Sequence, residues 1–179
     1  MRNKKHWKTQ KVVWQKCIMS WDTKKLFLML AFLAIGFSTS AQGAFSYGAN
    51  IGIPVADASN VASFSFGADA TYLYNYKEKW DLGFASNLQF YTGKNGLDGV
   101  TNLSLAGASR YDASGKIVLG FDLGWAFGIS PSGNDGGLYW KPMVGYNLSD
   151  KKLLTLSYNA VRKDKITIAN IGFGIMFNM

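Results

Sequence analysis

The side chains that most often carry out catalysis or bind transition metals are scarce in this chain of 179 residues. It has one histidine, His6, and one cysteine, Cys17. Both precede a short apolar segment with the features of an export signal. If the chain is cleaved after that segment, His6 and Cys17 are lost with it. The remaining chain then has no imidazole to activate a nucleophile, and a metal site would need clustered carboxylates. The sequence therefore predicts that the protein is not an enzyme and uses no cofactor.

Five charged residues lie well inside segments of alternating polarity: Asp69, Asp81, Arg110, Asp122 and Lys141. The three carboxylates could do acid–base chemistry, but they fall in different segments, and no neighbouring turn supplies a convergent partner. Because an unpaired buried charge is costly, we expect the five side chains to form a polar network with Asn, Ser and Thr in an interior. A polar relay or narrow ion path is the functional alternative.

The positive charge of the chain is concentrated near its start. The first 25 residues contain eight of the 19 basic residues and one of the 11 acidic residues, so the remaining chain is close to neutral. The net positive charge of the chain therefore belongs to a targeting region and does not indicate a nucleic-acid partner.

That region ends in a predicted signal peptide. An apolar run over residues 26–37 follows two lysines and precedes small residues, and it is shorter than the roughly 20 residues of a membrane-spanning helix. We expect residues 19–41 to be the signal peptide, with cleavage between Ala41 and Gln42. Residues 1–18 form a basic extension, which we interpret as lying upstream of the true translation start.

The elements that must position the five charged residues are strands, because apolar and polar residues alternate with a period of two along most of the chain after residue 42. Along residues 117–129, every odd position carries a large apolar side chain and most even positions carry Gly, Ala or Asp. Seven further segments alternate in the same way: residues 44–54, 62–76, 79–91, 100–111, 138–148, 153–161 and 166–179. Short connections rich in Gly, Asn, Asp, Ser and Lys separate them. Residues 42–179 are therefore predicted to be an all-β domain, an eight-stranded antiparallel up-and-down transmembrane β-barrel.

The composition of the polar face indicates which way this barrel faces. A soluble, lipocalin-like barrel is the alternative, and its outer face would carry many Lys, Glu and Arg side chains. Here the polar face is mostly Gly, Ala, Ser, Thr and Asn, which suit a crowded interior, whereas the bulky apolar face suits lipid. Aromatic side chains near three turns are expected to form an interfacial girdle: Tyr72, Tyr74, Tyr76, Trp80, Tyr111 and Tyr146.

The export signal, the eight alternating segments and the aromatic terminal segment resemble the small outer-membrane β-barrels of Gram-negative bacteria, of the outer membrane protein X and protein A transmembrane type. The end of the chain is similar to the C-terminal assembly signal of that family, with Asn170, Gly172, Ile175 and Phe177 in the matching positions. It departs from the family by two residues that follow Phe177. Gln42 after the cleavage site also resembles exported proteins of the Bacteroidota.

The resemblance implies an outer-membrane location, with outer-membrane lipid, lipopolysaccharide and the outer-membrane assembly machinery as partners. Eight strands enclose an interior just wide enough for side chains to fill. We therefore expect a structural or surface-interaction protein with a side-chain-filled lumen. The alternative is a narrow channel or carrier for small or apolar solutes, and Pro142, which cannot donate a ladder hydrogen bond, could mark a bulge or lateral gap for it. The ligand and the oligomeric state are left open.

Overall fold

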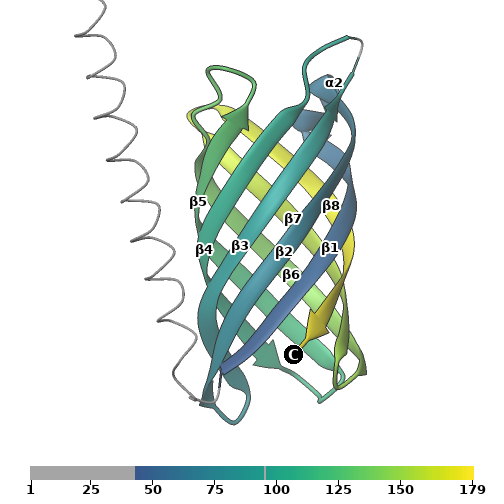
Figure 1. Cartoon of the computed structure of the whole chain (residues 1–179), viewed down its shortest axis with the longest axis vertical. Helices are drawn as coiled ribbons and strands as arrows, with labels where there is room; N and C mark the ends of the chain where they lie inside the picture. The colour runs from purple at the N-terminus through teal and green to yellow at the C-terminus, as the bar shows by residue number, and fades with distance from the viewer. Residues whose placement is uncertain (1–42, 95) are drawn as a thin grey trace, which may run out of the picture. The chain divides into compact units, whose positions relative to one another are not determined.

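A computed structural model describes residues 43–94 and 96–179 of the chain (Figure 1). The expectations for the basic extension, the signal peptide and its cleavage site lie outside the described residues. Within the described part, no helix is long and apolar enough to cross a membrane.

Eight strands form one closed sheet, each antiparallel to the next (Figure 1). Their bounds are β1 Gly43–Ala56, β2 Ala62–Lys77, β3 Trp80–Gly93, β4 Val100–Asp112, β5 Ile117–Ser130, β6 Gly137–Ser149, β7 Lys152–Lys163 and β8 Ile166–Asn178. The predicted eight-stranded antiparallel barrel is confirmed. Strand β7 is longer than the sequence indicated, because Arg162 and Lys163 continue its pairing with β8 although they do not alternate in polarity.

The two ends of the barrel differ in their connections. One end, here the α2 end, carries the connections after β1, β3, β5 and β7, and the first of these contains the single-turn helix α2, Ala58–Val61, which the sequence did not predict. The other end, here the terminal end, carries the start of β1, the end of β8 and the tight turns after β2, β4 and β6. Figure 1 shows the α2 end at the top and the C-terminus at the bottom.

The barrel is closed by pairing of its first and last strands. The register runs from Ser46 opposite Asn178 to Ala56 opposite Ile168. Closure leaves no sheet edge, so each strand has a hydrogen-bonding neighbour on both sides.

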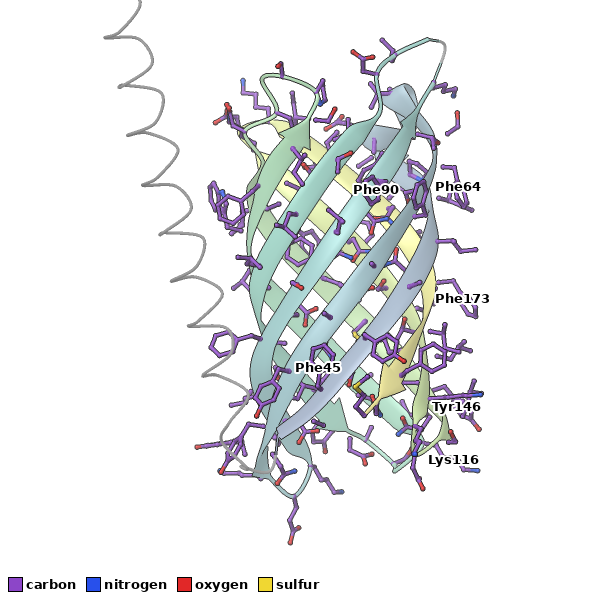
Figure 2. All side chains as sticks on the ribbon, viewed as in Figure 1. Phe45, Phe64, Phe90, Lys116, Tyr146 and Phe173 are labelled. Atoms are coloured by element: carbon purple, nitrogen blue, oxygen red, sulfur yellow. The ribbon has the colours of Figure 1, made fainter. Side chains whose placement is uncertain are left out.

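The two faces of the sheet are inverted relative to a soluble barrel. Large apolar side chains point outward, with Phe84 and Ile53 exposed by 74% and 69% (Figure 2). The side chains buried inside include Arg110, Asp122 and Lys141 among many Asn, Ser and Thr residues. The facing predicted from the alternation is confirmed. Five of the six predicted girdle aromatics are exposed, and the sixth, Tyr111, is half-buried.

The pairing of β6 with β7 is interrupted beside Pro142. The register of β6 on β7 includes Trp140 opposite Ala160 and Met143 opposite Ser157, and no pair is formed at the two β6 positions between them. Proline has no amide hydrogen to donate, which accounts for the gap. The register is unchanged across the gap, so of the two features that Pro142 could mark, a bulge or a lateral gap, the bulge is absent from this stretch. On the outer face, the rings of Trp140 and Tyr158 lie 5.1 Å apart beside the gap.

Candidate functional site

An ion pair crosses the barrel lumen near the middle of the strands. Lys141 on β6 donates from Nζ to Asp69 Oδ1 on β2 at 2.6 Å. Three strands separate β2 from β6 in either direction around the barrel, so these two side chains reach across the lumen from opposite walls. Asp69 also accepts hydrogen bonds from Asn50 Nδ2 at 2.6 Å and Asn87 Nδ2 at 2.9 Å. The carboxylate is thus held from three strands, and its side chain is only 9% exposed.

A second ion pair lies beside the first, between adjacent strands. Arg110 Nη1 on β4 donates to Asp122 Oδ1 on β5 at 2.5 Å and to the backbone oxygen of Ser109 at 2.9 Å. Asp122 stands directly opposite Lys141 in the β5–β6 register. Two cations and two carboxylates therefore form one neutral charged layer. Removing one member would leave an unpaired charge in a buried site, which typically costs about 3–5 kcal/mol.

Asp81, the fifth predicted residue, lies apart from this layer. It stands opposite Arg110 in the β3–β4 register, yet no ion pair joins the two in the described part of the chain. Asp81 instead accepts a hydrogen bond from Asn75 Nδ2 at 3.0 Å and is only half-buried. The structure therefore brings four of the five predicted residues together and places the fifth toward the terminal end.

Two buried tyrosines occupy the lumen between the charged layer and the α2 end, and the sequence analysis did not single them out. Tyr91 donates from its hydroxyl to Asn170 Oδ1 at 3.0 Å. Tyr139 is 2% exposed and packs in a cluster with Ala106, Ala126 and Val161. The signal was present in the alternation, because Tyr139 lies between the outward positions Leu138 and Trp140, and so has inward parity. It was missed because aromatic side chains were assigned to the lipid face.

The same part of the lumen contains polar atoms that lack partners. These buried atoms, which accept or donate no hydrogen bond within the described residues, are Asn50 Oδ1, Ser65 Oγ, Gln89 Nε2, Tyr139 Oη, Asn159 Oδ1 and Asn170 Nδ2. Buried polar groups are normally paired, so this layer gains less from hydrogen bonding per polar group than the charged layer does. The lumen is thus filled by side chains of two kinds, a charged layer held by two ion pairs and a tyrosine-containing layer with several unpartnered polar atoms.

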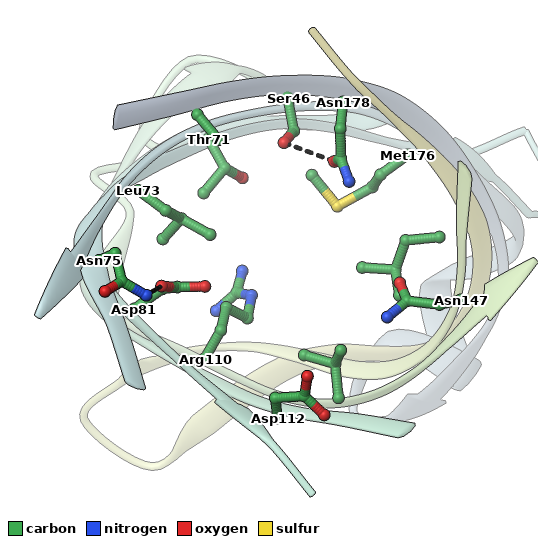
Figure 3. Close-up of a pocket in the computed structure, with 13 residues that line it drawn as sticks. Ser46, Thr71, Leu73, Asn75, Asp81, Arg110, Asp112, Asn147, Met176 and Asn178 are labelled. Carbon is green, nitrogen blue, oxygen red and sulfur yellow. Dashed lines mark hydrogen bonds between the residues drawn. The ribbon is translucent and has the colours of Figure 1, made fainter. Parts of the chain in front are cut away.

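The terminal end of the lumen opens into a cavity of about 260 Å³, here called the vestibule (Figure 3). Charged side chains line one wall: Asp81 from β3, and Arg110 and Asp112 from β4. Apolar side chains line other walls: Leu73, Val118, Leu153 and Met176. Leu153 and Met176 belong to a buried apolar cluster with Met143.

A second cavity of about 340 Å³ lies at the α2 end and is lined by residues of β4, β7, β8 and the β5–β6 loop. Lys163 and Asp135 form an ion pair at its rim. The hydrogen bond from Lys163 holds the pKa of the exposed Asp135 carboxyl below its usual value. Gly133 and Gly136 of the adjoining loop have φ of 90° and 76°, which accounts for the glycines there by backbone conformation.

The four residues of the predicted C-terminal assembly signal divide between the faces of β8. Asn170 and Gly172 are buried on the lumen side, whereas Ile175 and Phe177 are half-buried on the outward side, where the Phe177 ring lies 5.7 Å from that of Tyr47. Asn170 accepts the hydrogen bond from Tyr91, so it has a structural role in the lumen. No group of three metal-ligating side chains is found in the part of the chain that the structure describes.

Comparison with known proteins identifies the fold. No family model and no curated protein matches the chain. The crystal structure of Ail, the attachment invasion locus protein of Yersinia pestis, matches with a TM-score of 0.52 and 14% identity over 79% of this chain and 100% of Ail. The chain has the barrel fold of Ail. The backbone structure of Ail, described as an outer membrane protein, in a phospholipid bilayer nanodisc matches with a TM-score of 0.51 and 14% identity, over 75% of this chain and 99% of Ail.

A de novo designed transmembrane β-barrel matches with a TM-score of 0.50 and 12% identity, over 79% of this chain and 98% of the design. At these identities the likeness concerns the fold alone. A designed sequence and a natural outer membrane protein both share this barrel fold, so the role of the chain must be argued from its own residues.

Proposed function

We propose that the protein is an integral outer-membrane barrel with a closed lumen, acting as a structural or surface-interaction protein. The observation that carries the proposal is the inversion of the sheet: exposed residues such as Phe84 and Ile53 cover its outside, and ion pairs lie within it. In water this arrangement would expose a wide apolar surface and bury charge, whereas in a bilayer it places each face in a suitable environment. Ail, which has the same fold, is described as an outer membrane protein.

The mature protein on this proposal is residues 42–179, released by cleavage between Ala41 and Gln42, with residues 1–18 and 19–41 removed or never translated. Because the strands are even in number, both ends of the barrel domain lie on one side of the membrane. We assign the terminal end to the periplasm and the α2 end to the cell exterior. A tag inserted at Asn134 should then be labelled on intact cells, and labelling only after lysis would reject this topology.

The closed lumen rests on the ion pair between Lys141 and Asp69, which joins opposite walls. Purified protein in liposomes should therefore give no swelling in isosmotic arabinose. A matched variant, Lys141→Ser with Asp69→Ser, removes the cross-lumen pair and leaves the outer face unchanged. Swelling by the wild-type protein at the rate of a diffusion porin would overturn the closed-lumen proposal.

A narrow carrier for small or apolar solutes is the second candidate, and the interrupted ladder at Pro142 favours it. Unpaired backbone groups within a bilayer are costly unless they line a path, so the gap beside Pro142 is the lateral opening that this candidate would use. Swelling or solute uptake that disappears in Pro142→Val, which can donate the missing hydrogen bond, would select this candidate.

Lipopolysaccharide is the partner we propose for the α2 end. Four basic residues lie there, at a predicted bilayer surface where phosphate groups would contact them: Lys94, Arg162, Lys163 and Lys165. Four acidic residues of the same end, Asp57, Asp98, Asp135 and Asp164, balance the charge. Ail has been solved in complex with sucrose octasulfate, a heparin analogue. The balanced charge of the α2 end favours contact with local phosphates over a long polyanion.

The outer-membrane assembly machinery is the second proposed partner. Ile175 and Phe177 face outward on the closing strand and are available to a membrane-embedded receptor before β8 pairs with β1. Phe177→Asp should lower the yield of inserted, protease-resistant barrel more than Asn178→Asp, whose side chain lines the vestibule. Equal yields would argue against recognition through Phe177.

A further inference from the structure

The vestibule presents a buried cation with free donors. Arg110 is 5% exposed, and its Nη1 is occupied by Asp122 and the backbone oxygen of Ser109. Its Nε and Nη2 donate no hydrogen bond within the described residues, and Figure 3 shows the guanidinium directed into the cavity. An arginine whose remaining donors point together into a cavity is suited to a planar carboxylate.

Two carboxylates line the vestibule near this arginine. Asp81 Oδ1 accepts from Asn75, and Asp112 Oδ1 accepts from the backbone amides of Ser114 and Gly115, which leaves the other oxygen of each carboxylate free of these bonds. Arg110 is already neutralised by Asp122. The charge that remains unbalanced in the vestibule is therefore acidic and would attract an ammonium group.

The other walls of the vestibule are apolar. Four apolar side chains from different strands line it: Leu73, Val118, Leu153 and Met176. Figure 3 shows Leu73 and Met176 among them. Contact with such walls removes apolar surface from water and is favourable for an aliphatic or aromatic side chain. The volume of about 260 Å³ lies slightly below the range of typical drug-sized ligand pockets, so the guest must be small.

We propose that the vestibule binds a small zwitterion with an apolar side chain, such as an apolar amino acid or dipeptide. Its carboxylate pairs with the free donors of Arg110, and its ammonium pairs with Asp81 and Asp112. Its side chain packs against Leu153 and Met176. The charged layer closes the lumen behind the guest, so the vestibule is a binding site with one mouth. This proposal does not depend on which side of the membrane the terminal end faces.

Four probes dissect the proposed site: L-leucine, 3-methylbutylamine, 4-methylpentanoate and glycine. Each probe after leucine lacks one of the three recognised groups, namely the carboxylate, the ammonium and the apolar side chain. Binding is measured by saturation-transfer NMR on the full-length expressed protein, purified in detergent micelles. L-leucine should bind at least about tenfold more tightly than each of the others. Equal affinity of leucine and the amine, or of leucine and the acid, would overturn the proposal.

A pair of matched variants tests the acidic wall. Asp81→Asn keeps the size of the side chain and can still bond to Asn75, but it should weaken leucine binding about tenfold and leave 4-methylpentanoate unaffected. Asp150→Asn removes the same charge from the β6–β7 turn at the same end of the barrel, outside the vestibule lining, and should bind leucine as the wild type does. Unchanged leucine affinity in Asp81→Asn, or an equal loss in both variants, would show that the vestibule does not recognise the ammonium group.

Discussion

The barrel contains two Lys–Asp ion pairs of the same chemistry in opposite surroundings. In the lumen, the side chains of Lys141 and Asp69 are 5% and 9% exposed, and two asparagines share the carboxylate. At the rim of the α2 end, the side chains of Lys163 and Asp135 are 49% and 71% exposed. The comparison separates the effect of the ion pair itself from the effect of its burial.

The two pairs should therefore differ in what they do for the barrel. In the lumen, each charge is removed from water, which is costly. The folded barrel therefore loses stability when either charge is left without its partner. At the rim, water solvates either charge when the other is removed, and exposed pairs contribute little. The lumen pair determines how the interior is filled, whereas the rim pair only restrains a loop.

The largest effect is expected when the lumen pair loses its cation. Lys141→Met keeps a long side chain but leaves Asp69 unpaired across the lumen, and should lower the free energy of unfolding by about 3–5 kcal/mol. The double variant Lys141→Met with Asp69→Asn removes both charges and should recover most of that loss. Urea titration in lipid vesicles measures both variants. A double variant as unstable as the single one would mean that Lys141 acts by packing and not by charge.

A cation on the outer face is expected to have the next largest effect. Phe121 is exposed on β5, next to Asp122 along the chain but on the opposite face of the sheet. Phe121→Arg should cost roughly 2–4 kcal/mol because its charge faces lipid without a partner. Phe121→Leu is the control and should change the free energy of unfolding only slightly. Equal stability of the two variants in lipid vesicles would contradict the assigned facing of β5.

Glycine at position 120 is not a neutral control for that experiment. A Cβ there would lie 2.6 Å from Met143 Cγ and 2.8 Å from Arg110 Cδ. Even a small side chain would press on the arginine that the charged layer holds. The lumen is therefore sensitive to volume as well as to charge.

A smaller effect should separate paired from unpaired hydroxyls inside the lumen. Tyr91→Phe removes the hydrogen bond to Asn170 and should cost about 1–3 kcal/mol, since it leaves Asn170 Oδ1 buried without a donor. Tyr139→Phe removes a hydroxyl that has no partner among the described residues, and should be neutral or slightly stabilising. The two substitutions control for each other in the same urea titration. A larger loss in Tyr139→Phe would mean that its hydroxyl is bonded in the folded barrel.

The sequence was sufficient to predict the strands and their facing. A period of two fixes the face of every residue once one face is known, and turn residues mark the strand ends. The sequence could not predict which of the lumen charges form ion pairs with each other. Asp122 and Lys141 are direct neighbours on adjacent strands, so local register favours an ion pair between them. The structure pairs Lys141 with Asp69 on the opposite wall instead.

The pairing of Lys141 with Asp69 depends on the stagger of the strands in the closed barrel, which no single segment encodes. The stagger sets which residues of opposite walls share a level, and only the eight registers together define it. The vestibule was unpredictable for the same reason, because all eight strands contribute residues to it from positions far apart in the chain. Alternation assigns each residue a face but not a level along the barrel axis.

The smallest effect is expected at the rim, where the comparison predicts almost none. The hydrogen bond from Lys163 lowers the pKa of Asp135 from its ordinary value of 3.8. A lowered carboxyl pKa gives stability that is present above the ordinary value and lost as the pH falls through the lowered one. Because both side chains are exposed, solvent and salt screen this contribution. Asp135→Asn and Lys163→Met should therefore match the wild type in urea titration at neutral pH in 150 mM salt. A loss at the rim approaching that of Lys141→Met would show that burial is not what distinguishes the two ion pairs, and the rim pair would then have to be treated as part of the barrel's structure.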